Sequence, residues 1–276
     1  MTKKLANIIY QILFFHLRLL DKIFNVRLSY VFMDLISKNS YEFTYIKNKK
    51  VFFFIPNSFT KYRLETFFTK EVDTINWIKS FKRKKNVFWD IGANIGNYSI
   101  FSSIHNNNTK VYAFEPSVLN LRVLSRNISI NNLEKKITII QLPLSNKSNQ
   151  INLMQETTFE EGGSFNSFGA EYNSNLKTIK KSDIKNKYNI LGTSLDSLVR
   201  SKSIDLPDYI KIDVDGIEHL ILSGAKNILV NKKIKSMLIE LYPDNKLLFN
   251  KSIKILRSCN FKFDSKFGFN YIFKKI

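Results

Sequence analysis

The stretch Asn86–Gly96, NVFWDIGANIG, decides the fold of this 276-residue chain. Its run VFW at 87–89 is apolar and rich in β-forming residues, which predicts a strand buried on both faces. Gly92 and Gly96 follow, and residues 97–104, NYSIFSSI, have the pattern of a helix. Strand, glycine-rich turn and helix together indicate the first half of a nucleotide-binding βαβ unit.

Asp90 stands where a dinucleotide-binding fingerprint carries its first glycine. A carboxylate there would repel a pyrophosphate, which binds to bare N–H groups at a helix N-terminus. S-adenosylmethionine (SAM) has no phosphate and carries an ammonium and a sulfonium, so an acid beside the turn suits it. The pattern therefore favours SAM over a dinucleotide such as NAD, with capping of the next helix as the alternative role of Asp90.

A second apolar strand, Lys110–Pro116 (KVYAFEP), ends in Glu115. In a fold of this kind, an acid at the tip of the second strand holds the ribose hydroxyls of the ligand. Pro116 biases Glu115 toward extended geometry, which keeps its carboxylate at the strand tip. We therefore expect Asp90 and Glu115 to bind the cofactor together.

A further polar cluster follows the strand at 208–213, within the sequence KIDVDGIE at 211–218. Lys211 and Asp213 are two residues apart and point the same way from a strand. Ligands bind at the carboxyl ends of strands in an open α/β sheet, so this cluster is expected to face the glycine turn if the two strands are neighbours. Asp215 and Glu218 have the spacing of a capping box, which is a structural alternative for that part of the cluster.

Carboxylates at these strand ends also raise the question of a metal. Asp213, Asp215, Glu218 and Glu240 carry the oxygen donors that Mg²⁺ prefers, but the sequence gives no sign that they converge, and a divalent metal is not favoured. The single cysteine, Cys259, excludes an internal disulfide and a multi-cysteine zinc site.

Strands alternate with helices through the rest of the chain, which predicts a parallel sheet. The expected fold is a doubly wound, Rossmann-like α/β domain with a seven-stranded, mostly parallel sheet and an antiparallel last strand. Residues 145–190 are rich in Ser, Asn and Gly without clear periodicity, and we expect a loop or lid there. An amphipathic helix within 1–38 and a hairpin within 41–60 make residues 1–70 an appendage to a core domain at 71–276.

Charge is the strongest feature of the composition. The net charge is +20, and residues 1–85 hold 17 Lys and Arg against 6 Asp and Glu. This surplus favours an anionic partner, whether a membrane surface, a nucleic acid or a phosphate-bearing substrate. The N-terminal apolar run is too short to span a bilayer and lacks a signal-peptide cleavage site, so we expect a cytoplasmic protein. Its amphipathic helix is expected to pack on the domain or on a second subunit of a homodimer, with peripheral contact at an anionic inner membrane face as the alternative.

Five motifs occur in this order in the FkbM-type methyltransferases: DIGANIG, VYAFEPS, the Leu144-Ser145 pair, TSLDSL and KIDVDGIEHLILSGA. The chain resembles that family from about Glu71 to Pro243. The resemblance implies a SAM-dependent O-methyltransferase on a class I Rossmann-like fold, of a family that often acts on sugar hydroxyls of glycans, glycolipids or secondary metabolites. Carried over by position, Asp90, Gly92, Ala93, Asn94, Gly96, Glu115, Pro116, Leu144 and Ser145 would bind SAM, and Lys211, Asp213 and Glu218 would lie on the substrate side.

Two positions depart from the family pattern. Asp215 stands where the family usually has glutamate, and Asn146 stands where an acid commonly follows the Leu-Ser pair. The first departure shortens a carboxylate by one methylene, and the second weakens a contact expected near the adenine. Neither removes the SAM-binding pattern.

The expected reaction is direct transfer of the SAM methyl group to a hydroxyl oxygen, and the sequence leaves two rival hypotheses. Alignment of the reactants is the main task, and Asp213 is the expected base for the hydroxyl, with Lys211 tuning it. The rival enzyme is an RNA methyltransferase, but the chain lacks an Asn/Asp-Pro-Pro-Tyr motif and its basic residues are spread out, so no specific nucleic acid partner is expected. The rival outside catalysis is a membrane-surface interaction protein with a vestigial Rossmann core.

Overall fold

The computed structural model describes residues 2–82, 85–164, 166–169 and 181–276. Backbone contacts divide the chain into two compact units, Met1–Glu42 and Phe43–Ile276. The larger unit contains the sheet and starts at Phe43. The sequence pattern instead predicts that the core domain starts at residue 71. The unit starts earlier because the hairpin side chains Ile46, Val51 and Phe53 are buried in the same apolar cluster as the sheet residue Phe88.

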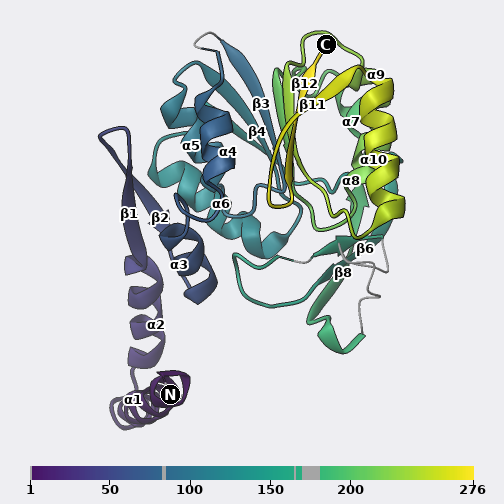
Figure 1. Cartoon of the computed structure of the whole chain (residues 1–276). Coiled ribbons are helices and arrows are strands. Elements are labelled where there is room, and N and C mark those ends of the chain that lie inside the picture. The colour runs from purple at the N-terminus through teal and green to yellow at the C-terminus, as the bar shows by residue number, and fades with distance from the viewer. Residues whose placement is uncertain (1, 83–84, 165, 170–180) are drawn as a thin grey trace. The chain divides into compact units, whose positions relative to one another are not determined.

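Seven strands form the central sheet in the order β11-β12-β10-β9-β3-β4-β5 (Figure 1). The strands β10, β9, β3, β4 and β5 are mutually parallel, and β12 runs antiparallel to both β10 and β11. This is the predicted Rossmann-like sheet with an antiparallel strand at its C-terminal end. The strands are β3 (Asn86–Ile91), β4 (Thr109–Phe114), β5 (Ile137–Ile140), β9 (Tyr209–Ile212), β10 (Ser236–Glu240), β11 (Phe261–Phe267) and β12 (Asn270–Lys275).

Helices cover both faces of this sheet, because successive residues of a buried strand point to opposite sides. Trp89 and Ile210 pack into the cluster under the C-terminal helices, while Phe88 and Tyr209 pack into the cluster under the helices of the N-terminal half. The first face carries α7 (Leu195–Arg200), α8 (Glu218–Ser223), α9 (Lys226–Leu229) and α10 (Lys246–Ser258), and the second carries α4 (Val72–Lys79), α5 (Asn97–His105) and α6 (Val118–Ile130). The helical segment after β9 is interrupted at Gly224 and Ala225, which separate α8 from α9.

Two elements precede the sheet in the larger unit. The hairpin of β1 (Tyr41–Ile46) and β2 (Lys49–Phe54) turns at Lys47, as its sequence predicts. The helix α3 (Ser58–Glu65), which the sequence analysis did not identify, starts at a capping box in which the Asn57 side chain accepts from the Thr60 N–H and the Thr60 side chain reciprocates.

The segment expected to be a loop or lid contains a small sheet instead. Its strands β6 (Gln150–Glu156), β7 (Ser167–Phe168) and β8 (Asn186–Gly192) are antiparallel, in the order β7-β6-β8, and a 3₁₀ turn (Lys181–Asp183) precedes β8. We call this segment, residues 145–190, the insert. An isolated bridge between Leu144 and Thr193 joins its two ends. Residue 165 and residues 170–180 of the expected lid lie outside the described residues.

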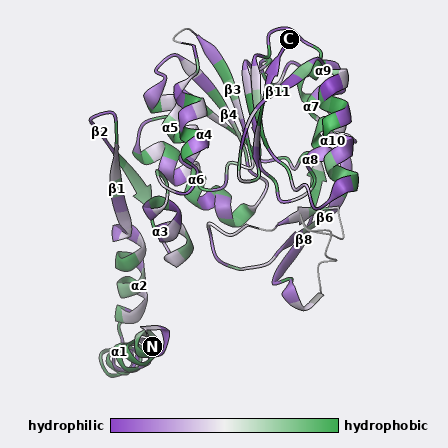
Figure 2. Cartoon of the chain, in the orientation of Figure 1, coloured by the Kyte–Doolittle hydropathy of each residue, from purple (hydrophilic) through white to green (hydrophobic). Residues whose placement is uncertain are grey.

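The smaller unit consists of two helices, α1 (Thr2–Phe24) and α2 (Leu28–Asn39). Phe14 of α1 is buried and contacts Phe32 of α2 edge to face, and the Ser29 hydroxyl donates to the Asp21 carboxylate. Most of the other α1 side chains are apolar (Figure 2). Among the described residues, no helix combines the length and the apolar character that crossing a bilayer requires.

Candidate functional site

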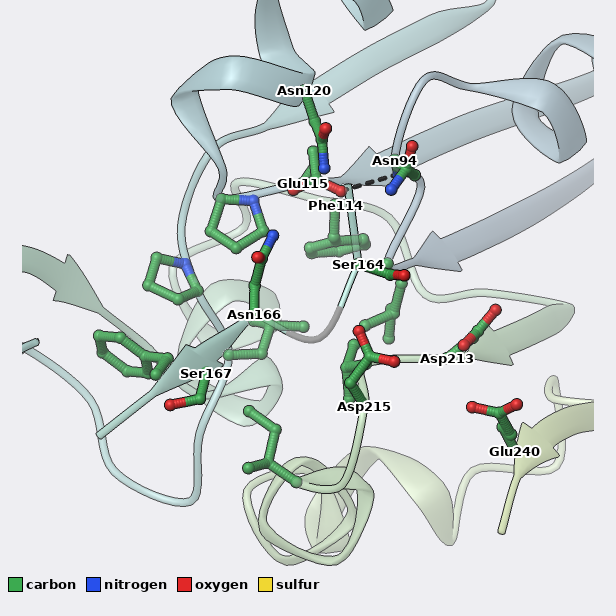
Figure 3. A pocket seen from close by; sticks show the side chains of 18 of the residues that line it. Asn94, Phe114, Glu115, Asn120, Ser164, Asn166, Ser167, Asp213, Asp215 and Glu240 are labelled. Atoms are coloured by element: carbon green, nitrogen blue, oxygen red, sulfur yellow. Dashed lines mark hydrogen bonds between the residues drawn. The ribbon is translucent and has the colours of Figure 1, made fainter. Parts of the chain in front are cut away.

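A cavity opens at the carboxyl ends of the parallel strands, where the strand order reverses between β3 and β9 (Figure 3). Each of the four central strands supplies at least one residue at or just beyond its end, and the insert and α3–α4 region supply the rest. The lining includes Gly92, Asn94, Glu115, Pro116, Leu144, Asp213, Asp215, Glu240 and Tyr242, the insert residues Met154, Gly163, Ser164, Asn166, Ser167 and Phe168, and Arg63, Lys70 and Glu71.

The glycine turn is held against β4 and β9. The N–H groups of Gly92 and Ala93 both donate to the Phe114 carbonyl, at 3.0 and 2.9 Å. Gly92 has a φ of 82°, and a Cβ added to it would lie 1.8 Å from the Asp213 carbonyl oxygen. Gly96 has a φ of 92° and would place a Cβ 2.6 Å from the Leu124 side chain, so it allows α5 to approach α6. Gly92 thus brings the ends of β3 and β9 together.

Replacing Gly92 by alanine is expected to lower the free energy of unfolding by about 3 kcal/mol, because the added methyl meets backbone and the φ is strained for an L-residue. Gly268 is a matched control, since it has a φ of 58° but no described atom within 4 Å of where its Cβ would lie. Gly268→Ala should cost only about 1 kcal/mol. Urea denaturation of both variants measures the difference, and equal losses would contradict the role given to Gly92.

Glu115 lines the cavity and is bound to the glycine turn. Its Oε2 accepts from the Asn94 N–H at 2.7 Å and its Oε1 accepts from the Ser117 N–H at 2.9 Å (Figure 3). The side chain is only 5% exposed, and burial raises the pKa of Glu115 to about 7 despite these two N–H donors. Pro116 lines the cavity next to it.

Asp90 does not line the cavity. It is fully buried, and its Oδ2 accepts from the Ser99 hydroxyl of α5 at 2.6 Å. Burial raises the pKa of Asp90, with the Lys211 ammonium opposing the rise. Its Oδ1 has no hydrogen-bond partner among the described residues. The structure therefore places Asp90 beneath the turn, and only Glu115 of the two expected cofactor acids reaches the cavity.

Lys211 and Asp213 form an ion pair at 2.8 Å, on the same side of β9 as predicted. Lys211 is 1% exposed, lies beside Asp90 in the strand register, and has its Nζ 5.1 Å from the Tyr98 ring centre. Burial lowers the pKa of Lys211, but the Asp213 and Asp90 carboxylates outweigh burial and hold that pKa above its usual value. This side chain is therefore a permanent cation beneath the acids at the cavity.

Glu240 joins Asp213 at the same end of the cavity (Figure 3). It accepts a hydrogen bond from the Tyr242 hydroxyl at 2.7 Å. Burial and the Asp213 charge raise the pKa of Glu240 to about 9. Burial also raises the pKa of Asp213, but Lys211 more than offsets this and brings it below the ordinary value. At neutral pH the pair therefore holds one proton, on Glu240, and Asp213 is the ionised member.

Glu218 and Ser145 lie away from the cavity lining. The Glu218 carboxylate accepts from the N–H groups of Gly216 and Val214, at 3.1 and 3.4 Å, and burial raises its pKa to about 7. These bonds secure the turn after β9, but they do not form the capping box that the spacing offered, because α8 begins at Glu218 with Ile217 as its N-cap and has no side-chain cap. Ser145 donates to the Asn146 side chain at 3.2 Å, whereas the adjacent Leu144 lines the cavity.

The insert supplies cavity residues that the sequence did not identify. The Gly163 carbonyl accepts from the side-chain amides of Asn94 at 2.7 Å and Asn120 at 3.4 Å. The neighbouring Gly162 donates to Asn120 at 2.8 Å and accepts from Arg63 Nε at 2.5 Å. The Gly-Gly pair at 162–163 is the one sequence sign of this approach, because a Cβ at Gly162 would lie 3.1 Å from the Thr60 side chain of α3.

Among the ranges that the structure describes, no group of three or more His, Cys, Asp or Glu side chains is arranged to hold a metal ion. Asp213, Asp215 and Glu240 line one cavity, but Glu218 faces the turn beneath it. No metal is assigned to the site.

A glycine turn after the first strand, an acid at the tip of the second and a cavity at the switch point define a Rossmann-like α/β protein of the kind that binds a nucleoside-containing ligand. Residues 90–263 match the family model described as the methyltransferase FkbM domain. This match spans more than half of the chain, and the chain therefore belongs to the FkbM methyltransferase family.

The chain is also similar to several individual proteins. The chain is 26% identical over 172 residues to the hexuronic acid methyltransferase AglP of Haloferax volcanii, and the alignment covers 62% of each chain. Similar solved structures include an FkbM methyltransferase from Methylobacillus flagellatus (TM-score 0.47, 17% identity, 70% of this chain and 44% of that one). Another is the precorrin-6y C5,15-methyltransferase of Geobacter metallireducens (TM-score 0.43, 13% identity, 75% and 87%). The chain thus spans less than two thirds of the length of AglP and of the Methylobacillus protein.

Proposed function

We propose that this methyltransferase uses SAM to methylate a hydroxyl group of a sugar in a glycan, a glycolipid or a related metabolite. The observation that carries the proposal is the division of the cavity into two chemically different ends. Figure 3 shows Glu115 and Phe114 toward one end of the cavity and Asp213 and Glu240 toward the other, and the apolar residues Leu142, Leu144, Met154 and Phe168 also line it.

The residues present fit SAM. The Glu115 carboxylate suits ribose hydroxyls, and the apolar residues beside it suit an adenine ring. The carboxylate of Asp215 suits the ammonium and the sulfonium, a role expected from the sequence for Asp90. When bound, SAM supplies a methyl group on a positively charged sulfur that leaves as a neutral thioether.

Asp213 is the base in this proposal. Its lowered pKa keeps it ionised at neutral pH, and its Oδ2 is fixed by Lys211. As the new oxygen–carbon bond forms and the carbon–sulfur bond breaks, the proton of the acceptor hydroxyl passes to the Asp213 carboxylate. Glu240, held by Tyr242, already carries a proton and therefore does not compete for the hydroxyl proton.

Two facts support a sugar acceptor. AglP, a hexuronic acid methyltransferase, shares 26% identity with this chain over 172 residues. The acceptor end is also lined by groups that hydrogen-bond readily, including Arg63, Lys70 and Glu71, as recognition of a polyhydroxylated molecule requires. Incubation with methyl-labelled SAM and purified acidic and neutral oligosaccharides tests this, and label found only in RNA would refute it.

The affinity for SAM is expected to rise about tenfold between about pH 6 and about pH 8, because Glu115 has a pKa of about 7 in the free protein. Ribose hydroxyls donate to the ionised carboxylate, so binding draws Glu115 into its charged form and is weakened wherever that group is protonated. Calorimetric titration across this range measures the slope.

Glu115→Gln should remove this pH dependence. Glu218→Gln is the matched control, since Glu218 has a similar pKa but bonds to the turn outside the cavity lining, and it should leave the slope intact. A slope that survives Glu115→Gln would contradict the assignment of Glu115 to the ribose.

A further inference from the structure

The N-terminal unit exposes a broad apolar surface on α1. Phe14 and Leu17 are the buried side chains of this helix, on the side that contacts α2. Most of the remaining apolar side chains are at least one third exposed, and they include Leu5, Ile8, Ile9, Ile12, Leu19 and Ile23, of which Ile12 is 57% and Ile23 is 62% exposed. With 3.6 residues per turn, these six positions fall on one continuous side of α1. An exposed apolar surface of this extent marks an interaction site.

A basic row borders this apolar surface. Lys4, Arg18 and Lys22 fall on one strip of α1, between the apolar side and the rest of the polar side. Arg18 and Lys22, together with Phe15 and Leu19, line a shallow hollow at this border. Cations beside apolar and aromatic groups match the boundary between phosphate headgroups and acyl chains.

Charge favours lipid over a second copy of the chain. Residues 1–40 hold six Lys and Arg side chains against two Asp and no Glu, and one of the two, Asp21, accepts hydrogen bonds from Ser29. Two such units brought face to face would repel each other and offer few acids to pair with the basic row. An anionic bilayer supplies the opposite charge over its whole surface.

We propose that the α1–α2 unit docks on the surface of an anionic phospholipid bilayer, with α1 lying in the plane of the interface. Its apolar side enters the acyl-chain boundary, and Lys4, Arg18 and Lys22 contact lipid phosphates. This reverses the preference of the sequence analysis, which favoured packing of the helix against protein. The proposal concerns where the protein is held and does not depend on which hydroxyl it methylates.

The test uses the full-length chain and vesicles that are either pure phosphatidylcholine or phosphatidylcholine with phosphatidylserine, separated by flotation. The unaltered chain should bind the anionic vesicles much more strongly. Ile12→Asp, at the centre of the apolar side, should abolish binding, whereas Asn7→Asp, which makes the same charge change on the polar side, should not. Replacing Lys4, Arg18 and Lys22 by glutamine should weaken binding on the order of 100-fold.

Several results would overturn the proposal. They are failure to bind either vesicle, equal binding to both, or equal effects of Ile12→Asp and Asn7→Asp. A concentration-dependent dimer that Ile12→Asp dissociates, without vesicle binding, would assign the apolar surface to a second copy instead. Matching thermal unfolding curves for the variants separate loss of docking from loss of folding.

Discussion

Asp213→Asn is expected to reduce methyl transfer on the order of 10²–10⁴-fold, because it removes the base that accepts the hydroxyl proton. The amide keeps the shape of the side chain and can still contact Lys211, so SAM affinity should change by less than about tenfold. Single-turnover transfer from labelled SAM, combined with calorimetric titration, separates the two quantities.

Asp215→Asn is the matched control for this loss. Asp215 lines the same cavity and has a φ of 61°, a conformation that asparagine adopts readily. The same loss of charge at that position should leave at least a tenth of the activity. Near-equal losses in the two variants would show that Asp213 contributes only charge, and an active Asp213→Asn enzyme would remove it from the reaction altogether.

Lys211→Met is expected to lower the free energy of unfolding by about 3–5 kcal/mol, because it leaves buried carboxylates without their cation. Lys211 is 1% exposed and contacts Asp213, with fully buried Asp90 beside it in the register of β3 and β9. The methionine fills most of the same volume, so the loss reports charge rather than a cavity. Urea denaturation near neutral pH measures it.

The exposed ion pair of Lys110 and Asp205 provides the comparison. Its two side chains are 45% and 55% exposed, although their distance of 2.9 Å is nearly the same as in the buried pair. Lys110→Met should therefore cost about 1 kcal/mol or less. Similar losses of stability in the two lysine variants would show that burial does not make the Lys211 charge more important for stability than the exposed charge of Lys110.

The sheet could be predicted because its central strands carry continuous apolar runs. All six residues of β3 are buried, which is why the pattern at 86–91 indicated a strand covered on both faces. The insert lacked such a signal, since β6 and β8 consist mostly of exposed and partly buried residues and pair across about 30 residues of intervening chain. Long-range pairing of half-polar strands leaves little trace in a local sequence pattern.

The residues of the site could likewise be predicted only in part. Glu115 and Asp213 lie at or beyond strand ends, where chain direction alone brings them to one edge of the sheet. Asp90 lies inside β3, with the same parity as Phe88, and this parity directs it toward α5 instead of the cavity. The contributions of Arg63 and the insert depend on tertiary contacts, such as that between Arg63 and Gly162, that no local pattern encodes.

The central claim is that this FkbM-family chain methylates sugar hydroxyls with SAM, and one labelling experiment tests it most directly. Full-length protein is incubated with methyl-labelled SAM and separate glycan, glycolipid and RNA fractions of the source cells, with Asp213→Asn as the inactive control. The account predicts label in a glycan or glycolipid fraction, released as an O-methyl sugar on acid hydrolysis and absent with Asp213→Asn. Label confined to RNA, or equal label with both proteins, would contradict it.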